Sequence, residues 1–334
     1  MPLAFPIPVL LLFGPTASGK TEVLETLFTG AGAFSLAEIV SADSMQVYQG
    51  MDIGTAKPSQ ELRARLPHHL IDIRAPDEPF NVGDFVHLAS ELCADIAARG
   101  KLPVLSGGTG FYLKNFVQGL PAAPPSDALI RRELREELRL RGAPALAEEL
   151  AGYDPISAAR IHINDKYRLL RALEVFRLTG KPLSSFAMSG QSALSRYRFL
   201  LIGLERPREE LYRRINERCA AMFRVGLANE VQRLFEAGYT PKDPGLRAIG
   251  YHEFFEEDAA GNFALKTNLD EVEALVARNS RHYAKRQITY FASLANNDGP
   301  PIHWVSAADA PVERIRMDME KLLLKQGQPV TLNP

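Results

Sequence analysis

The sequence predicts an α/β fold, with a parallel sheet flanked by helices and an α-helical domain inserted into it. Short apolar runs alternate with helical patterns in the first third of the chain, which is typical of a parallel sheet. A glycine-rich turn joins the first apolar run to the helix that follows. A Pro-rich segment at 121–125 precedes helix-rich sequence, and a strand-like run at 197–204 then returns to the core.

The first part of the chain supplies the elements around which a site can form. We expect strands at 8–13, 38–42 and 102–105, a helix that begins at Thr21, and a helix at 84–99. Ligands of parallel sheets bind beyond the carboxyl ends of the strands. The segments that follow these three strands should therefore surround one crevice. They are the glycine-rich turn, Asp43-Ser44-Met45-Gln46 and Gly107-Gly108-Thr109-Gly110.

The inserted part is predicted to be helical and basic. Ile130, Leu134 and Leu138 recur at four-residue spacing, which indicates an amphipathic helix. Arginines lie between them and should form a cationic outer face: Arg131, Arg132, Arg135 and Arg139. We expect residues 1–120 to be the first part of the α/β core, 121–195 the helical insertion, 196–325 the second part of the core, and 326–334 a tail.

Bulk properties restrict the class of protein. The 334 residues are 46% hydrophobic and 24% charged, which indicates a soluble globular chain of two domains. The apolar first thirteen residues fit a buried strand better than a signal peptide. Cys93 and Cys219 lie far apart and fit structural packing in a reducing cytoplasm. A net charge of −1 and a pI of about 6.7 do not by themselves indicate a nucleic-acid-binding protein.

The glycine-rich turn is a phosphate-binding loop, so the predicted core is P-loop NTPase-like. Backbone N–H groups of such loops converge on phosphate oxygens, and the next helix adds its N-terminal dipole. Lys20 should reach the outer phosphates, and the Thr21 hydroxyl can hold Mg2+. The loop consists of Gly14, Pro15, Thr16, Ala17, Ser18, Gly19, Lys20 and Thr21.

A phosphate loop alone favours an ATPase or a small-molecule kinase. However, the strand at 102–105 ends in Ser106, Gly107, Gly108 and Thr109, where an ATPase would offer a carboxylate to the magnesium shell. The best-placed acid is Asp43, which could act as a general base. A role in capping its loop or in holding the metal stays open for Asp43.

Two cationic features complete the pattern. A long helix at 208–235 places Arg218 beside its apolar stripe, so a diphosphate or an internal carboxylate must meet the guanidinium. A later helix has no acid between Arg278 and Tyr290, and its cations are interleaved with aromatic and amide groups. That pattern fits an RNA-binding surface, with solvated charge as the alternative.

In these segments the sequence resembles the bacterial tRNA dimethylallyltransferases of the IPP transferase family, over nearly its whole length. The matching segments are the phosphate loop, Asp43-Ser44-Met45-Gln46-Val47-Tyr48, Gly50-Met51-Asp52-Ile53-Gly54-Thr55-Ala56-Lys57-Pro58, His68-His69-Leu70-Ile71-Asp72, Gly107-Gly108-Thr109-Gly110, Arg171-Ala172-Leu173-Glu174-Val175, Ala248-Ile249-Gly250-Tyr251 and Lys285-Arg286-Gln287-Ile288-Thr289.

The resemblance implies transfer of a dimethylallyl group from dimethylallyl diphosphate to N6 of adenosine 37 in tRNA. The phosphate loop then holds a prenyl diphosphate, with Mg2+ as the cofactor. Asp43 would accept the proton of the amine, Thr109 would position the reacting groups, and Arg218 would stabilise the leaving diphosphate. Prenylation of free adenine nucleotides and a P-loop kinase remain the alternatives.

The resemblance also implies that the helical insertion clamps the anticodon arm around a flipped-out base. Tyr167 departs from the family pattern, which commonly carries Gln at this position. A cytoplasmic monomer without a membrane partner is expected. The residues implied to bind tRNA are Asp43, Ser44, Met45, Gln46, Thr109, Arg131, Tyr167, Arg168, Arg171, Arg247, Gly250, Tyr251, Lys285, Arg286 and Gln287.

Overall fold

The computed structural model describes residues 6–29, 37–120, 122–186, 196–294, 299–309 and 311–324. The chain divides into two compact units. Unit 1 consists of residues 1–117 and 195–334, and unit 2 consists of residues 118–194. The predicted tail lies outside the described residues.

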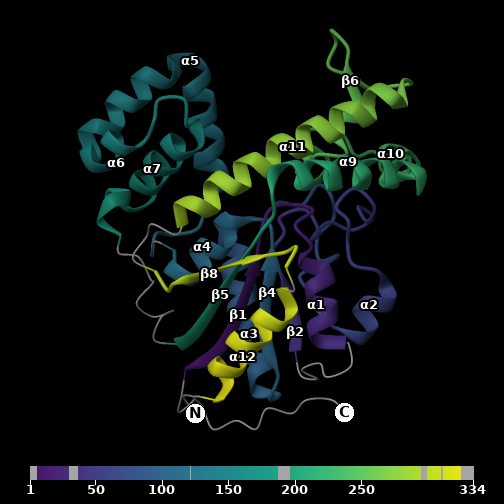
Figure 1. Ribbon diagram of the computed structural model, residues 1–334. Helices are drawn as coiled ribbons and strands as arrows, with labels where there is room; N and C mark the ends of the chain where they lie inside the picture. The colour runs from purple at the N-terminus through teal and green to yellow at the C-terminus, as the bar shows by residue number, and fades with distance from the viewer. Residues whose placement is uncertain are drawn as a thin grey trace. The chain divides into compact units, whose positions relative to one another are not determined.

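Unit 1 contains a six-stranded sheet in the order β3-β2-β4-β1-β5-β8, and all of its strand pairs are parallel (Figure 1). This confirms the predicted α/β class. The strands are β1 (Ile7–Phe13), β2 (Ala37–Ser41), β3 (His68–His69), β4 (Leu102–Gly107), β5 (Tyr197–Glu205) and β8 (Ile302–Ser306). The four strands expected from sequence match β1, β2, β4 and β5 to within two residues at each end. β3 and β8 were not expected.

Helices cover both faces of this sheet because alternate strand residues point to opposite faces. Leu10 and Leu12 of β1 pack in one hydrophobic cluster with residues of α1 (Lys20–Thr29), α2 (Gln60–Arg65) and α12 (Pro311–Leu324). On the other face lie α3 (Val82–Ala98) and α4 (Gly110–Gln118), and Phe116 of α4 contacts the rings of Tyr197 and Phe199.

The register of the central strands brings three predicted motifs to one edge. Phe13 of β1 pairs with Gly107 of β4, and Ser41 of β2 pairs with Ser106 of β4. The next residues along these strands begin the phosphate loop, the Asp43 segment and the Thr109 segment. These segments therefore lie side by side at the carboxyl ends of β1, β2 and β4, as the sequence predicts.

The second half of unit 1 adds helices at the same end of the sheet (Figure 1). They are α9 (Arg208–Arg224), α10 (Leu227–Glu236) and α11 (Leu269–Leu294), with η2 (Gly245–Arg247), η3 (His252–Phe254) and the hairpin β6 (Phe255–Glu257) and β7 (Phe263–Leu265). The prediction of one helix over 208–235 is wrong. Gly226 has φ 103°, a left-handed conformation that ends α9 and starts α10.

Unit 2 is helical. Its elements are α5 (Ala128–Tyr153), α6 (Pro155–Arg160), α7 (Lys166–Thr179) and η1 (Leu183–Ser185). α5 is interrupted at Gly142, where φ is 78° and ψ is 165°. Leu134, Leu150 and Leu173 belong to its hydrophobic core. The prediction that Arg131 lies on the outer face of this helix is wrong, because its side chain is only 10% exposed and pairs with buried Glu174.

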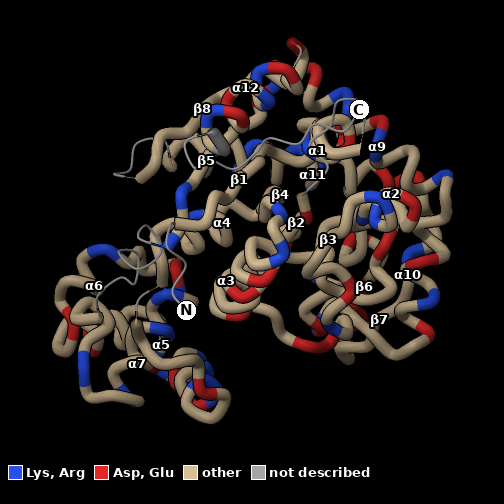
Figure 2. The backbone as a smooth tube through the Cα atoms, turned by 90° about the horizontal axis from the view of Figure 1, so that it is seen from below, with Lys and Arg blue, Asp and Glu red and all other residues tan. Residues whose placement is uncertain are grey.

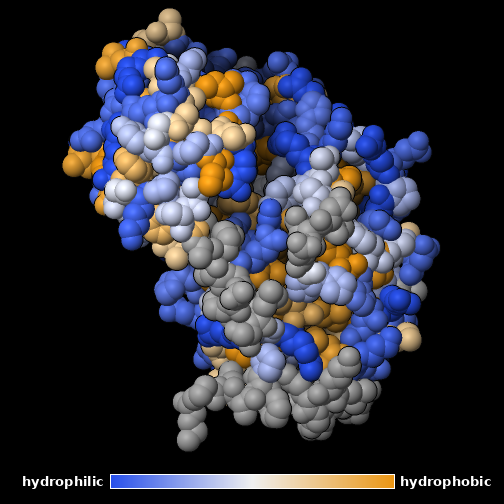
Figure 3. Space-filling model, turned by 90° about the vertical axis from the view of Figure 1, so that its left-hand side faces the viewer, coloured by the Kyte–Doolittle hydropathy of each residue, from blue (hydrophilic) through white to orange (hydrophobic). Residues whose placement is uncertain are grey.

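Charges of both signs are interspersed along each unit (Figure 2), and the face drawn in Figure 3 mixes hydrophilic and hydrophobic residues. Within the described ranges, no helix combines the length and the apolarity that a membrane span needs. Cys93 and Cys219 are both buried and unpaired, which confirms their assignment to packing.

Candidate functional site

The phosphate loop has the conformation expected of an anion cradle. Ala17 and Gly19 both have positive φ, at 62° and 101°, which turns successive backbone N–H groups toward one side. α1 begins at Lys20, so its N-terminus faces the same space. Ser18 is fully buried, and its Oγ has no hydrogen-bond partner among the described residues. Its backbone N–H donates to the Pro15 carbonyl at 3.2 Å, so the predicted contact of Ser18 with phosphate stays a prediction.

Two cations point into this region, and neither has a carboxylate partner among the described residues. Lys20 Nζ donates to the carbonyl oxygens of Gly14 and Pro15 at 2.9 and 3.0 Å. Arg218 Nη1 donates to Thr16 Oγ1 at 3.0 Å. Burial, together with repulsion from Arg218, lowers the pKa of Lys20 to about 8, although Asp43 acts in the opposite direction. Burial also lowers the pKa of Arg218. Both shifts indicate a site that an anion would stabilise.

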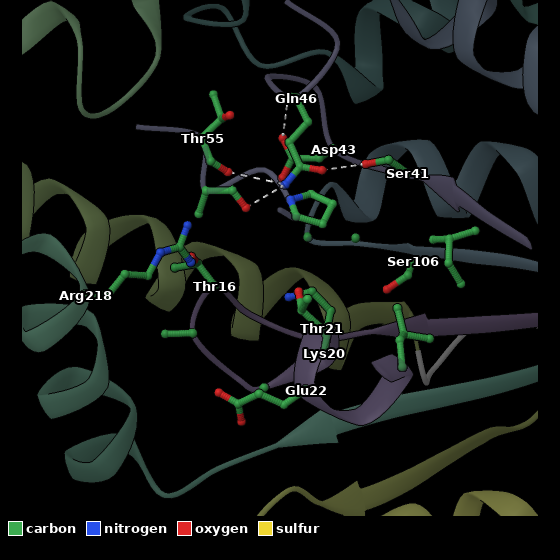
Figure 4. Close-up of a pocket in the computed structure, with 18 of the residues that line it drawn as sticks. Thr16, Lys20, Thr21, Glu22, Ser41, Asp43, Gln46, Thr55, Ser106 and Arg218 are labelled. Carbon is green, nitrogen blue, oxygen red and sulfur yellow. Dashed lines mark hydrogen bonds between the residues drawn. The ribbon is translucent and has the colours of Figure 1, made fainter. Parts of the chain in front are cut away.

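A cavity of about 510 Å³ opens onto the phosphate loop. Its lining includes Thr16, Ala17, Gly19, Lys20 and Thr21 of the loop, whereas Gly14, Pro15 and Ser18 do not line it. In Figure 4, Thr16 lies beside Arg218, and Lys20 and Thr21 lie across from Asp43 and Gln46. The three motifs predicted to surround one crevice therefore do so, with Gly107 and Gly108 from the third.

A second cavity of about 270 Å³ adjoins the first. The two share Thr16, Asp43, Thr55, Arg218 and Tyr283 in their linings. Apolar side chains form much of the wall of the second cavity, namely Met45, Ile215, Met222, Ala248, Ile249 and Val276. An anion cradle and an apolar compartment thus meet at Asp43 and Arg218.

Asp43 uses one carboxylate oxygen to shape its own loop. Oδ1 accepts hydrogen bonds from the backbone N–H of Met45 at 2.9 Å and of Gln46 at 3.4 Å. Within the described part of the chain, no donor hydrogen-bonds to Oδ2. The capping role that the sequence left open is therefore real. It uses only Oδ1, so Oδ2 is left to face a ligand at the junction of the two cavities.

Thr109 and Tyr283 lie next to Asp43. Thr109 Oγ1 accepts the Ser44 N–H at 3.1 Å, so Thr109 fixes the loop although it lines neither cavity. Tyr283, which sequence reasoning missed, lines both cavities. Burial and the negative charge of Asp43 raise its pKa to about 12, although hydrogen bonds with Thr109 and Gln287 oppose the shift. Its hydroxyl therefore stays protonated and able to donate at neutral pH.

Gln287 joins two of the loops around the first cavity. Its Oε1 accepts the Thr16 N–H at 2.8 Å, and its Nε2 donates to the Gly108 carbonyl at 2.8 Å. A Cβ at position 108 would lie 2.4 Å from Nε2, so any other residue there would displace the Gln287 amide. Gln287 is 5% exposed. Its predicted contact with tRNA stays a prediction, but both ends of its amide are engaged within the protein.

The other residues of unit 1 predicted to bind tRNA differ in exposure. Arg247, Lys285 and Arg286 are exposed, and Arg286 lines the second cavity. Gly250 is buried, and Tyr251 has no exposed surface. Tyr251 therefore lacks the surface that a predicted RNA contact needs in this structure.

In unit 2, three of the four predicted RNA-binding residues form a network around Glu174, and Arg168 lies outside it. Arg131 and Arg171 donate to Glu174 Oε2 at 3.1 and 3.0 Å. The Arg131 guanidinium also lies 4.6 Å from the centre of the Tyr167 ring. Tyr167 is 69% exposed, and Arg168 is exposed and paired with Asp165. Tyr167 and Arg168 present surface, whereas Arg131 is buried.

The donor set of the first cavity fits magnesium held mainly by a bound diphosphate. No cluster of three His, Cys, Asp or Glu side chains with metal-binding geometry exists among the described residues. The Thr21 side chain is exposed and lines the cavity. Mg2+ commonly keeps several waters and takes one or two protein oxygens together with phosphate oxygens. A single hydroxyl beside an anion cradle is consistent with that mode.

Three comparisons with known proteins agree with this geometry. A sequence model described as IPP transferase matches residues 46–294. A tRNA dimethylallyltransferase of Geobacter sulfurreducens is 48% identical over 297 residues, 89% of this chain and 91% of that protein. The crystal structure of a tRNA isopentenylpyrophosphate transferase from Bacillus halodurans is 36% identical, with a TM-score of 0.65, over 96% of this chain and 98% of that one. A eukaryotic dimethylallyltransferase, 23% identical with a TM-score of 0.77, shares the fold over 97% of this chain and 81% of its own.

Proposed function

The chain belongs to the IPP transferase family, and we propose that it transfers the dimethylallyl group of dimethylallyl diphosphate to N6 of adenosine 37 in tRNA. The products are N6-isopentenyladenosine and diphosphate. The observation that carries the chemistry is the meeting of an anion cradle and an apolar compartment at Asp43 and Arg218.

The first cavity suits the diphosphate. Lys20 and Arg218 would neutralise the charge that grows on the leaving oxygen as the allylic C–O bond breaks. Thr21 would hold Mg2+, which would supply further charge neutralisation on the diphosphate. The turned N–H groups of the loop would orient the phosphates, except for the Thr16 N–H, which donates to Gln287, and the Ser18 N–H, which donates to the Pro15 carbonyl.

The second cavity suits the acceptor side of the reaction. Its apolar walls would contact the five-carbon chain and the purine where they meet. The exocyclic amine becomes acidic as it attacks the allylic carbon, and Asp43 would then accept one of its protons. The protonated hydroxyl of Tyr283 and the loop contact of Thr109 would hold the reacting groups in place.

The RNA-facing residues follow from exposure. We propose that Arg247, Lys285 and Arg286 in unit 1, and Tyr167 and Arg168 in unit 2, contact the anticodon arm. Arg131 and Arg171 would support this surface from inside unit 2 by donating hydrogen bonds to Glu174. Arg131 would also position Tyr167 by stacking on its ring. All of these groups lie on one chain, which supports a monomer.

Two alternative functions would also use a phosphate loop. A kinase would turn over ATP, and a related prenyltransferase would modify free adenine nucleotides. The absence of a carboxylate at the end of β4 disfavours the kinase, because Ser106 stands there instead. The arginine-rich unit 2 favours a polyanionic acceptor over a free nucleotide.

One assay separates these functions. Radiolabelled dimethylallyl diphosphate is mixed with unmodified tRNA or with AMP, and ATP hydrolysis is followed in parallel. We expect label in tRNA at adenosine 37 and no phosphate released from ATP. Label in AMP but not in tRNA, or phosphate release from ATP, would reject the proposal.

A further inference from the structure

A loop of residues 50–58, hereafter the 50–58 loop, forms part of both cavity walls. Thr55, Ala56 and Pro58 line the first cavity, and Gly54 and Thr55 line the second. The loop contains no helix or strand, so other groups must fix its backbone.

Glu230 of α10 binds the backbone of this loop. Its carboxylate oxygens accept the N–H groups of Asp52 at 2.9 Å, of Ile53 at 2.9 and 3.1 Å, and of Gly54 at 3.1 Å. Glu230 is only 2% exposed. Within the described residues, no Lys, Arg or His side chain pairs with it, so three consecutive backbone donors stabilise its charge.

Tyr251 completes the arrangement. Its hydroxyl donates to Glu230 Oε1 at 2.7 Å, and its side chain has no exposed surface. A Cβ at position 54 would lie 2.5 Å from the Tyr251 ring, so only glycine permits this approach. The segment at 248–251, in which the resemblance implies that Gly250 and Tyr251 bind tRNA, thus packs directly against the 50–58 loop.

The 50–58 loop connects in turn to the Asp43 segment. Gln46 Nε2 donates to the carbonyl oxygens of Thr55 and Ala56, both at 3.3 Å. Gln46 Oε1 accepts from Ser41 Oγ at 2.9 Å, as Figure 4 shows. The backbone N–H of Gln46 donates to Asp43 Oδ1 at 3.4 Å. A continuous series of contacts therefore runs from Glu230 through the loop to Asp43.

We propose that Glu230 is a positioning residue for prenyl transfer, and that Tyr251 supports Glu230 instead of contacting RNA. Glu230 holds the 50–58 loop so that Gln46 keeps Asp43 at the junction of the two cavities. The four donors are the N–H groups of residues 52–54 and the Tyr251 hydroxyl. Only a carboxylate can accept from all of them, because an amide would direct its own N–H groups at backbone N–H groups. The inference rests on the proposed function, since the rate that it affects is that of prenyl transfer.

The test compares two variants with a matched control. Glu230→Gln keeps the size of the side chain and removes its charge, and Tyr251→Phe removes one hydroxyl. Glu236→Gln is the control, because Glu236 lies on the same helix, is exposed and bonds only Gln232 in the described structure. Single-turnover transfer, affinity for inorganic diphosphate, affinity for tRNA and the urea unfolding midpoint are measured for each protein.

For Glu230→Gln we expect the single-turnover rate to fall by about 10- to 100-fold, the scale of a misplaced reactive group. Its affinity for diphosphate should stay unchanged, because the phosphate loop does not contact Glu230. Tyr251→Phe should slow transfer by about fivefold, the effect of one hydrogen bond, with unchanged affinity for tRNA. Glu236→Gln should behave as the wild type.

A wild-type rate in folded Glu230→Gln would overturn the inference, as would a loss of rate that equals its loss of folded protein. If Glu230→Gln does not fold, Tyr251→Phe decides, and an unchanged rate or a weakened affinity for tRNA in that variant overturns the inference. A wild-type protein that transfers no label to tRNA would instead refute the proposed function before any variant is compared.

Discussion

Arg131 and Arg171 of unit 2 and Arg218 of unit 1 meet opposite kinds of partner. In unit 2, Arg131 and Arg171 both donate to one carboxylate, Glu174, whose side chain is fully buried. In unit 1, Arg218 meets only the Thr16 hydroxyl, and no carboxylate of the described residues lies within 4.0 Å of it or of Lys20. The network around Glu174 thus satisfies its cations internally, whereas Arg218 and Lys20 face a cavity. Elsewhere in unit 1, buried Lys57 pairs with Asp52 and Asp72, and buried Arg206 pairs with Glu210.

This difference separates cations that stabilise the fold from cations that bind a ligand. Burying a cation without an anion costs free energy. An unpaired cation at a cavity therefore indicates that a ligand supplies the anion. The sequence left two partners open for Arg218, a diphosphate or an internal carboxylate. The structure finds the internal carboxylate beside Arg131, where the sequence predicted an exposed cation, and finds none beside Arg218.

The largest effect should come from Arg218→Met. Removing a charge that stabilises the leaving diphosphate should lower single-turnover transfer by about 100- to 1000-fold. The free energy of unfolding of the empty protein should stay the same or rise, because a half-buried cation without a carboxylate partner among the described residues is lost. Quenched-flow transfer assays and urea unfolding measure the two quantities.

The matched control is Arg213→Met. Arg213 lies on the same helix but is exposed and pairs with Glu217 at 2.7 Å. It should change neither the rate nor the stability beyond the small contribution of a surface ion pair. If Arg218→Met destabilises the protein while leaving the rate intact, Arg218 is a structural charge and the contrast between the units fails.

The next effect is that of Asp43→Ala. We expect at least about a hundredfold loss of single-turnover transfer, the usual scale for a general base. Affinity for dimethylallyl diphosphate should be retained or improved, because a negative charge leaves the cation-lined cavity. Equilibrium binding of the radiolabelled diphosphate checks the second expectation. Unchanged chemistry in this variant would remove Asp43 from the mechanism.

Much of the core of the site could be predicted from the sequence, because strand ends in a parallel sheet fix where the following residues lie. The phosphate loop, Asp43 and Thr109 each follow a strand directly. Their meeting therefore needed only the strand order and the rule for carboxyl ends. The position of Arg218 followed from helical periodicity in the same way.

The rest depended on contacts between residues far apart in the chain. Glu230 lies 176 residues or more from the three amides that it binds, and Gln287 lies 271 residues from Thr16. No local pattern reports such pairs. The inward turn of Arg131 was missed for the same reason, because its partner Glu174 lies 43 residues away on another helix. Tyr283 was overlooked among the cations of its own helix, although it precedes Gln287 by one turn.

A smaller effect, and one on stability, is expected for Glu174→Ala. The variant leaves Arg131 and Arg171 without their carboxylate, and Ser126 and the Asp127 N–H also lose their acceptor. Removing one partner of a buried ion pair is destabilising. We expect a loss of about 2 kcal/mol in unit 2, below the usual range because Arg171 reaches solvent.

Hydrogen exchange of unit 2 amides measures this loss, and Glu136→Ala is the control. Glu136 is exposed and pairs with Arg139 at 2.6 Å, so its removal should cost no more than the small contribution of a surface ion pair. Burial raises the pKa of Glu174, but hydrogen bonds from Ser126 and Arg171 more than offset this, and the net shift is downward. The stabilisation by Glu174 should therefore fade as the pH falls through that lowered pKa. Equal losses in the two variants would contradict the contrast.

The smallest effect is a pH dependence that arises at Lys20. Its pKa in the empty protein is about 8, whereas a free lysine titrates near 10.4. As the pH rises from 7 to 9, the ammonium is lost and affinity for dimethylallyl diphosphate should fall by about tenfold. Over about pH 8 to 10 the unfolded chain binds more protons at this residue than the folded chain, so the free energy of unfolding of the empty protein should rise.

Affinity and stability should therefore move in opposite directions over the same pH interval. A paired structural lysine would instead lose stability as it deprotonates, because its folded pKa would lie above the unfolded value. Lys20→Met serves as the reference for both measurements, since it keeps the pH dependence of the ligand and of every other group. Calorimetric titration of the ligand and urea unfolding at each pH give the two slopes. If stability and affinity fall together relative to Lys20→Met, then Lys20 is held by an internal anion in the same way as Arg131 and Arg171.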